Sequence, residues 1–541
     1  MSRRFEQREL ALVLALLAVA ALVRLPGVFS RAIWYDESIS LVTSAGNAQP
    51  AWPAEPVRAA EVQRFFTGQA DLGHVVDEVR RFDVHPPLYY WALGQWRNTF
   101  GASLESARGF SLLCSLAAIL ALYLLLRSAR LKGALPMTLV YALSTGAAHS
   151  GHEARAYALA SALLLSAAWL VYRAFQLASD AGQTAGLCAL GAAVAGGLAF
   201  HVNYLSIFPV ATLFGWLAIA TWRRSRAIAI AAPLLAAAIV GLGATTLSQQ
   251  MGSRTGQLAG FIGWLPELAV LLRVNTQMIG IPLNSGAPWL ATLAAMGLFL
   301  FLLGLTAYQL LRHWREVDRA FWILIAGLAT APSAGVLLLD LAFDKRLHVS
   351  RYVNFAGPAL ALLVSYGLVT LLRSPRRAIG LAALAGLLAI QASNLNWGLE
   401  LCPNSEFGSQ SRSLAHLIHS TSSPHHAVVM ADGDDPSGNV GALIYELHPD
   451  VVVLRYGKGA DLDELVARIA PFDDLWIVAS ADGGTRKEET ELLRRLETSG
   501  RYRGILRYGG AAHLAKIDPA SAAGEGTLAL EESHRKPEQG G

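Results

Sequence analysis

Charged residues are scarce in this chain. Asp, Glu, Lys and Arg make up 16% of its 541 residues, whereas 53% are hydrophobic, and the net charge is only +4. So small a net charge gives no sign of a basic surface that binds nucleic acid. The composition is typical of an integral membrane protein.

Cysteine is nearly absent, with three residues in the whole chain. Cys114 and Cys188 fall in apolar runs, and only Cys402 lies outside them, so no disulfide within one domain is expected. The first apolar run also lacks a small-x-small cleavage site and exceeds the usual length of a signal-peptide core, which predicts a retained helix.

Long apolar runs, in contrast, are abundant. A hydrocarbon core of roughly 30 Å needs about 20 apolar residues in a helix. About eleven runs meet this need, and the predicted spans are residues 9–29, 109–126, 133–149, 157–172, 184–200, 205–221, 227–247, 288–311, 320–340, 353–372 and 378–394.

The distribution of Arg and Lys between the spans predicts their orientation, because basic residues in short loops mark the cytoplasmic side. With a cytoplasmic N-terminus, alternate loops are basic, and they carry Arg127, Arg130, Lys132, Arg173, Arg223, Arg224, Arg226, Arg312, Arg315, Arg319, Arg373, Arg376 and Arg377. An odd number of spans then leaves everything after residue 394 outside the cytoplasm.

Three regions lie outside the predicted spans. The first outer loop, residues 30–107, ends in an aromatic segment, 85–100, which suits a helix lying along the membrane interface. A second segment, 248–287, contains the apolar stretch 264–281, which suits a similar surface helix or a re-entrant one.

The third region is the tail from about residue 395. Short apolar strands at 427–432, 450–457 and 474–480 alternate with helical patterns, which predicts a parallel α/β sheet over residues 396–519, closed by an antiparallel pair. The sheet has no Gly-rich phosphate loop, so a binding or stabilising role is favoured over chemistry. Residues 520–541 are rich in Gly, Glu, Ser and Lys and are expected to be disordered.

One basic cluster breaks the orientation rule. It lies in a loop that the topology puts outside, and it consists of Lys345, Arg346, His348, Arg351 and Tyr352, preceded by Asp344. An anionic lipid phosphate is the simplest reason for basic residues at that surface, which indicates a lipid-linked substrate.

An acidic pair, Asp36 and Glu37, follows Trp34 and Tyr35 directly after the first span. Adjacent acids are often only solvated charges, but at an interface an idle carboxylate is costly once desolvated. Such a carboxylate could act as general base on an acceptor, or hold a divalent metal on a phosphate.

Two further motifs fall on the same predicted side. In the first, Asp83 and His85 precede two prolines that start the interfacial helix, and Asp83 could instead cap a turn. In the second, Glu153 and Tyr157 stand one helical turn apart with Arg155 between them.

Residues His149, His152 and Glu153 could also be read as metal ligands, although this spacing is a weak signal. His201 and Tyr204 lie at another outer membrane edge, where an interfacial aromatic belt and a substrate role are equally favoured.

Four motifs follow one another along the chain: the acidic pair, D-x-H-P-P-L-Y-Y, E-A-R-x-Y and a late R-Y pair. With these motifs in this order the chain resembles the GT-C glycosyltransferases, and the resemblance is strongest to the ArnT-like and protein O-mannosyltransferase groups. The resemblance covers roughly residues 5–395. It implies a membrane domain over residues 1–395, located in the bacterial cytoplasmic (inner) membrane. The tail is similar to the periplasmic domain of some of these enzymes.

The resemblance implies transfer of a sugar from a polyprenyl-phosphate carrier to an acceptor outside the membrane. Asp36 would be the catalytic base, Glu153 the acidic residue of the second outer loop, and Lys345, Arg346 and Arg351 the ligands of the carrier phosphate. No cofactor is implied, although a divalent metal held by Asp36 and Glu153 is an open alternative.

Two other classes of protein agree less well with these motifs. A lipid or solute transporter would carry ionisable groups at mid-membrane, whereas the polar motifs here gather at one side. A sensor that reads a ligand with its α/β tail would not explain Asp36, His85 and the basic loop together.

Overall fold

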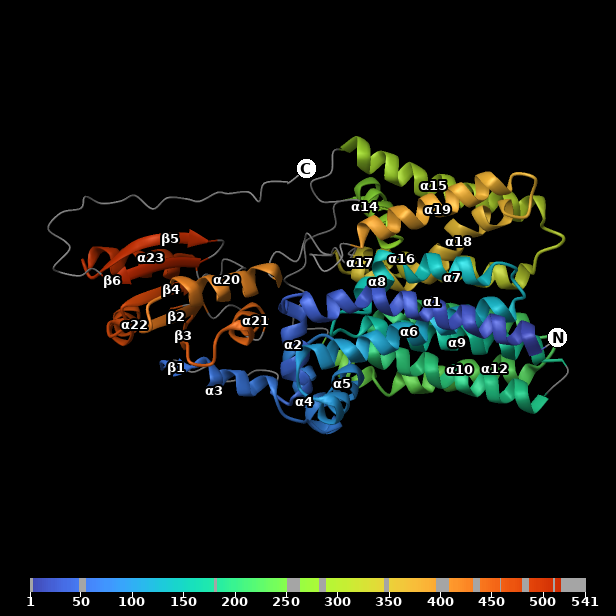
Figure 1. Ribbon diagram of the computed structural model, residues 1–541. Coiled ribbons are helices and arrows are strands. Elements are labelled where there is room, and N and C mark those ends of the chain that lie inside the picture. Colours follow the sequence, from blue (N-terminus) through green and yellow to red (C-terminus); the bar gives the residue numbers. More distant parts are fainter. Residues whose placement is uncertain are drawn as a thin grey trace. The chain divides into compact units, whose positions relative to one another are not determined.

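The computed structural model describes residues 3–47, 55–179, 182–250, 263–281, 289–344, 350–395, 408–431, 438–457, 459–478, 486–508 and 511–516. Contacts within the chain divide it into two compact units. The membrane unit comprises residues 1–30 and 71–404, and the α/β unit comprises residues 31–70 and 405–541 (Figure 1).

Helices alone build the described part of the membrane unit. They are α1 (Arg3–Ser30), α4 (Leu72–Phe82), α5 (Pro87–Phe100), α6 (Leu104–Ser128), α7 (Ala134–Ala142), α8 (Thr145–Ser150), α9 (Tyr157–Leu177), α10 (Gly182–Val202), η2 (Tyr204–Ser206), α11 (Ile207–Thr221), α12 (Arg226–Gly241), α13 (Ala244–Gln250), α14 (Trp264–Met278), α15 (Trp289–Arg312), α16 (Arg319–Phe343), α17 (Ser350–Val353), η4 (Asn354–Ala356), α18 (Gly357–Leu371) and α19 (Arg377–Asn394). Helix α9 packs between α6 and α10, and α18 packs against α7, α15 and α19 (Figure 1).

The structure confirms the predicted polytopic helical fold and corrects the number of spans. Among the described residues, nine helices are long and apolar enough to cross a membrane, or ten if the bent pair α12 and α13 counts as one span. The prediction of eleven was too high because the apolar run 133–149 is divided into α7 and α8, and neither is long enough alone.

The chain leaves the helical path at Ser144, which has an extended conformation between α7 and α8. This break frees backbone carbonyls, and buried carbonyls need donors where no water is present. Two distant side chains supply them: Arg24 of α1 donates from Nη2 to the Ala142 carbonyl at 3.1 Å, and Gln391 of α19 donates to the Val140 carbonyl at 3.0 Å. The interruption is therefore stabilised by neighbouring helices.

Both segments that we predicted as surface or interfacial helices are helical, as α5 and α14. Tyr89 and Tyr90 of α5 are buried in the protein. Proline stands in the first turn of α5, where its missing N–H and fixed φ favour a helix start.

The α/β unit contains one six-stranded sheet. Its elements are α2 (Tyr35–Ser44), β1 (Val57–Arg58), α3 (Ala59–Gln63), η1 (Arg64–Phe66), α20 (Gly408–Thr421), β2 (His426–Ala431), α21 (Asn439–Glu446), β3 (Val452–Tyr456), α22 (Leu462–Ile469), β4 (Asp474–Val478), α23 (Arg486–Thr498), β5 (Tyr502–Tyr508) and β6 (Ala511–Lys516). The strand order is β1-β3-β2-β4-β6-β5.

Strand pairing in this sheet matches the predicted pattern. Strand β2 pairs in parallel with β3 and β4, and β5 and β6 form the expected antiparallel pair. Helices cover both faces: α22 and α23 bury one apolar cluster against the sheet, and α3, α20 and α21 bury the other (Figure 1).

Strand β1 comes from the first outer loop and was not predicted. It pairs antiparallel with β3 at the edge of the sheet. Residues 31–70 thus belong to the α/β unit by their contacts, although the predicted boundary at residues 395 and 396 assigned them to the membrane domain. The predicted disordered tail, 520–541, lies outside the described residues.

Helix packing in the membrane unit depends on close approach at small residues. A Cβ at Gly335 of α16 would lie 2.1 Å from Cγ of Phe208 in α11. We expect Gly335→Ala to destabilise the protein by about 1–3 kcal/mol through overpacking, seen as a lower melting temperature in detergent.

Gly304→Ala in α15 is the matched control, because no atom lies within 4 Å of its Cβ position. Its melting temperature should stay the same or rise, since alanine is the better helix former. Equal melting temperatures for the two variants would contradict the assignment of tight packing between α11 and α16.

Candidate functional site

Asp83 is the centre of a buried hydrogen-bond network in the turn between α4 and α5. Its Oδ1 accepts from the backbone N–H of Val84 at 2.6 Å and from His85 Nδ1 at 2.8 Å. Its Oδ2 accepts from the Tyr90 hydroxyl at 2.6 Å. The carboxylate is 8% exposed and its oxygens are occupied by donors of its own loop and of α5.

The network continues to Arg155, in the non-helical segment between α8 and α9. Arg155 donates from Nη1 to the Tyr90 hydroxyl at 3.3 Å, and its Nη2 lies 3.2 Å from Nε2 of His85. Because a guanidinium can only donate, Nε2 of His85 accepts, and the ring proton belongs on Nδ1, where it faces Asp83. Asp83 therefore orients the arginine through His85 and Tyr90.

The electrostatic environment keeps Asp83 ionised. Burial alone would raise the pKa of this carboxyl group, but the adjacent His85 ring, the positive charge of Arg155 and the hydrogen bond from Tyr90 outweigh it and hold the pKa well below its usual range. A carboxylate this acidic, with its lone pairs engaged, is a poor general base. Its geometry suits a positioning role.

Gln250 makes further polar contacts that fix the loop between α4 and α5. Gln250 of α13 donates from Nε2 to the carbonyls of Val79 at 2.8 Å and His85 at 3.1 Å, and its Oε1 accepts from the Tyr204 hydroxyl at 2.7 Å. Tyr204, predicted to bind substrate, thus reaches the network through Gln250. No sequence motif marked Gln250, which follows an ordinary apolar run.

His201 was also predicted as a substrate ligand, with an interfacial role as the alternative. In the structure its Nε2 lies 2.7 Å from the carbonyl of Ile239, so the ring N–H donates to the end of α12. There α12 and α13 meet at a 45° bend, and a Cβ on the nearby Gly243 would lie 3.0 Å from the ring. This contact gives His201 a structural function at the bend.

Glu153 lies in the same non-helical segment as Arg155 and is almost fully buried. Its Oε2 is 3.1 Å from Nε2 of His149 on α8. The segment rests against α1, since a Cβ at Gly27 would lie 2.6 Å from Cγ of His152. Tyr157 begins α9 and is buried beside this segment.

Only part of the predicted basic cluster is described. Lys345, Arg346 and His348 lie outside the described residues. Asp344 ends α16 with a left-handed conformation, φ 49°, and the Arg351 guanidinium lies 5.4 Å from the centre of the Tyr352 ring in α17.

Helix α17 is tied to the segment that carries His149 and Glu153. Asn354, in η4 directly after α17, donates from Nδ2 to Oγ of Ser150 in α8 at 2.7 Å. A Cβ on Gly146 would lie 2.4 Å from the Asn354 side-chain oxygen, so the two residues approach closely. Arg351 and Tyr352 are therefore held near α8.

Asp36 and Glu37 occupy the first turn of α2 in the α/β unit, and both side chains are buried. Acidic residues in a first turn are stabilised by the helix dipole. These two residues thus belong to a different compact unit from Asp83, His85 and Arg155.

Metal binding was an alternative for Asp36, His149, His152 and Glu153. Within the described ranges, no group of three or more His, Cys, Asp or Glu side chains is arranged to hold a metal ion. His149 and His152 face each other edge to face, with ring centres 5.5 Å apart.

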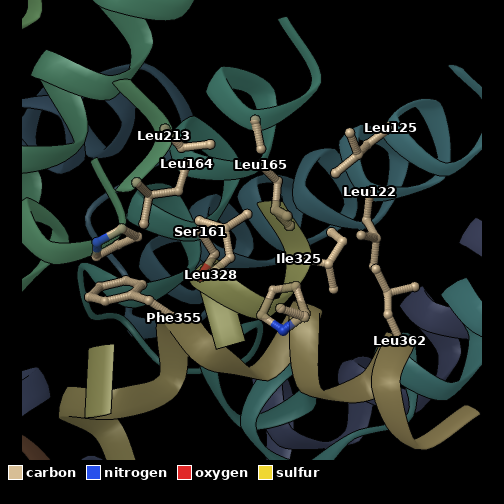
Figure 2. Close-up of a pocket in the computed structure, with 14 residues that line it drawn as sticks. Leu122, Leu125, Ser161, Leu164, Leu165, Leu213, Ile325, Leu328, Phe355 and Leu362 are labelled. Atoms are coloured by element: carbon tan, nitrogen blue, oxygen red, sulfur yellow. The ribbon is translucent and has the colours of Figure 1, made fainter. Parts of the chain in front are cut away.

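An apolar cavity of about 30 Å³ lies deeper among the membrane helices (Figure 2). Its lining comes from α6, α9, α11, α16, η4 and α18, and Ser161 is the only lining residue with a hydroxyl group. A buried water needs two to four polar partners, so this cavity suits neither water nor a sugar. The polar chemistry lies in the loops described above.

Comparison with solved structures shows which proteins share this fold. The chain resembles ArnT from Cupriavidus metallidurans in the apo state, with a TM-score of 0.52 and 14% identity over 96% of this chain and 100% of that one. The same protein bound to undecaprenyl phosphate gives a TM-score of 0.49 at 14% identity over 95% and 99%. The apo oligosaccharyltransferase of Archaeoglobus fulgidus gives 0.43 at 13% identity over 94% and 74%.

Residues 84–247 match the family model of dolichyl-phosphate-mannose-protein mannosyltransferases, which is less than a third of the chain. The matched segment contains His85, Arg155 and Tyr204 and leaves out Asp36. No curated protein sequence matches the chain significantly. The predicted resemblance to GT-C glycosyltransferases is confirmed, and fold and family match together support a multi-pass membrane glycosyltransferase.

The difference in stability between wild type and Asp83→Asn should depend on pH. The folded-state pKa of Asp83 lies below the ordinary value of 3.8. Ionised Asp83 therefore stabilises the folded state above pH 3.8, and this stabilisation is lost as the pH falls from 3.8 towards the folded-state pKa. The melting temperature of Asp83→Asn should lie below wild type by a constant interval from pH 8 to pH 5, and the interval should narrow towards pH 3.

Asp77→Asn is the control, because Asp77 is exposed and lies 3.8 Å from its partner Arg80. Exposed ion pairs contribute little, so its melting curve should follow wild type throughout. An interval for Asp83→Asn that is as wide at pH 3 as at pH 7 would refute the ionised state assigned to Asp83.

Proposed function

We propose that this chain transfers a sugar from a polyprenyl-phosphate carrier to an envelope acceptor on the extracytoplasmic side of the membrane. The observation that carries the proposal is the buried, oriented guanidinium of Arg155, held by Tyr90 and His85 inside the segment that matches the mannosyltransferase family. The acceptor is a lipid, a glycan or a protein.

The chemistry needs stabilisation of negative charge at the leaving group. The bond between the anomeric carbon and the phosphate oxygen breaks, and its electron pair remains on the carrier phosphate. A fixed arginine beside that phosphate lowers the barrier, because charge-assisted hydrogen bonds strengthen as the charge develops. In this proposal Arg155 and Arg351 bind the phosphate, with Lys345, Arg346, His348 and Tyr352 of the same loop.

The acceptor needs a base. We assign this role to Asp36, which takes the proton of the acceptor hydroxyl or amine as its oxygen or nitrogen attacks the anomeric carbon. Attack opposite to the leaving phosphate inverts the configuration at that carbon. Glu37 and Glu153 would supply further negative charge near the acceptor or a cation, while Asp83 and His85 orient Arg155.

Support for a lipid carrier comes from the neighbouring proteins as well as from the charges. ArnT of C. metallidurans has been solved bound to undecaprenyl phosphate, and the matching family is described by its dolichyl-phosphate-mannose donor. The reaction would take place at the outer face of a bacterial cytoplasmic membrane, with the N-terminus of the chain on the cytoplasmic side.

Turnover should depend on Asp36. We expect Asp36→Asn to lower the turnover of labelled polyprenyl-phosphate sugars by about 100-fold or more, since a general base typically contributes that much. The assay uses purified full-length protein with a membrane extract as the acceptor source. Glu61→Gln, at an exposed acid of the same unit, should retain wild-type turnover.

A folded Asp36→Asn protein with near wild-type turnover would exclude Asp36 as the base. If the wild type binds the carrier but consumes no sugar donor across a panel of sugars, the transferase proposal fails and lipid transport becomes the better explanation.

Arg155 should be sensitive even to a conservative change. Lysine keeps the charge but cannot reach both Tyr90 and His85, so we expect Arg155→Lys to lower kcat by roughly 10-fold and Arg155→Gln by roughly 100-fold. Arg81→Gln, at an exposed site in the last turn of α4, should leave kcat unchanged. Unchanged kcat in Arg155→Gln would remove Arg155 from the phosphate site.

A further inference from the structure

The peptide that carries the acidic pair is built into the α/β unit. Residues 31–70 and residues from 405 onward form one compact body, and α2 packs against α21 within it. Asp36 and Glu37 thus belong to the same compact unit as the C-terminal tail.

Polar contacts fix the chain just before α2. The backbone N–H of Ile33 donates to Oε1 of Glu446, at the end of α21, over 3.1 Å. Arg412 of α20 donates to both oxygens of Glu446 at 3.0 Å and to the carbonyl of Arg31 at 3.2 Å. Two helices of the α/β unit therefore hold both ends of the short peptide 31–33.

Close packing fixes the first residue of α2. A Cβ at Gly438, which precedes α21, would lie 2.2 Å from Cε2 of Tyr35. The absence of a side chain at Gly438 thus leaves room for the ring. Tyr35 is the immediate neighbour of Asp36, so the packing of this ring fixes the position of the first turn of α2.

The chain after α2 is attached to the same helix. Gln63 donates to the carbonyls of Ile444 at 2.9 Å and Leu447 at 2.8 Å, at the C-terminal end of α21. The rings of Phe66 and Tyr445 pack edge to face with centres 5.2 Å apart. Helix α21 thus anchors the chain on both sides of the acidic pair.

We propose that the C-terminal α/β domain positions the catalytic base. Through α21 and α20 it sets the location of the start of α2, with Glu446, Arg412 and Gly438 as positioning residues. The proposal rests on the function assigned to Asp36 above. A base acts only within hydrogen-bond distance of the proton it removes, and a displacement of about 1 Å can cost roughly 100-fold in rate.

Gly438→Ala and Glu446→Leu in the full-length protein test this role. Each should lower kcat for donor consumption by roughly 10- to 100-fold, with the KM for the carrier unchanged, because carrier binding is assigned to the membrane unit. Glu446→Gln should retain most of the activity, because its amide oxygen can still accept from Ile33. Asp450→Ala, at the exposed partner of Arg58 beyond the end of α21, is the control and should match wild type.

The acid limb of the kcat profile against pH provides the second readout. A displaced base changes its apparent pKa, so the limb should move in Gly438→Ala and Glu446→Leu, whereas a partly unfolded sample would scale kcat equally at every pH. Arg412→Gln serves as the variant least harmful to folding, since its side chain is 44% exposed, and it should show the same change in smaller measure.

Outcomes separate this inference from the proposed function. If Asp36→Asn is inactive but Gly438→Ala, Glu446→Leu and Arg412→Gln all keep wild-type kcat and pH profile, the α/β domain does not position the base and the proposed reaction stands. If Asp36→Asn is fully active, the proposed base is wrong. Loss of carrier affinity with kcat preserved would also overturn the positioning role.

Discussion

Inside a bilayer every backbone carbonyl needs a donor from the protein, and the membrane unit depends on this constraint. Two of its helical segments are interrupted, at Ser144 and between α12 and α13. Arg24 and Gln391 satisfy carbonyls freed at the first interruption, and His201 donates to a carbonyl at the second. Each interruption leads into a short helix that serves the site: α8 precedes the segment with Arg155, and α13 carries Gln250.

Two side chains link the negative charge of Asp83 to the positive charge of Arg155. Asp83 is linked to Arg155 through His85 and Tyr90, so its negative charge helps to orient the guanidinium from a distance. These hydrogen bonds restrict the rotamers of the arginine. A guanidinium held in this way needs little reorganisation when negative charge develops beside it.

Sequence patterns predicted the elements whose stability is local or apolar. Most long runs became membrane helices, and the strands of the α/β unit other than β1 appear where alternation and β-branched residues suggested them. The run 133–149 misled the prediction because it is apolar throughout, and its break depends on donors from α1 and α19. For His201, position at a membrane edge suggested substrate binding or an interfacial role, and its contact with Ile239, 38 residues away in sequence, was not predicted. Such long-range polar contacts leave no local pattern.

The C-terminal domain has no phosphate loop, and the division of the chain into units suggests another use for it in a transferase. A domain that only bound an acceptor would need no hold on residues 31–70, yet this one incorporates them as α2, β1 and α3 and anchors them on α21. An ordered α2 also limits the conformational freedom of the acidic pair, because a short helix after a membrane span has little stability of its own. Deletion of the tail would therefore take away the support of the base as well as any ligand site. Activity lost on deletion is therefore what a positioning domain requires, and it says nothing in favour of a sensor.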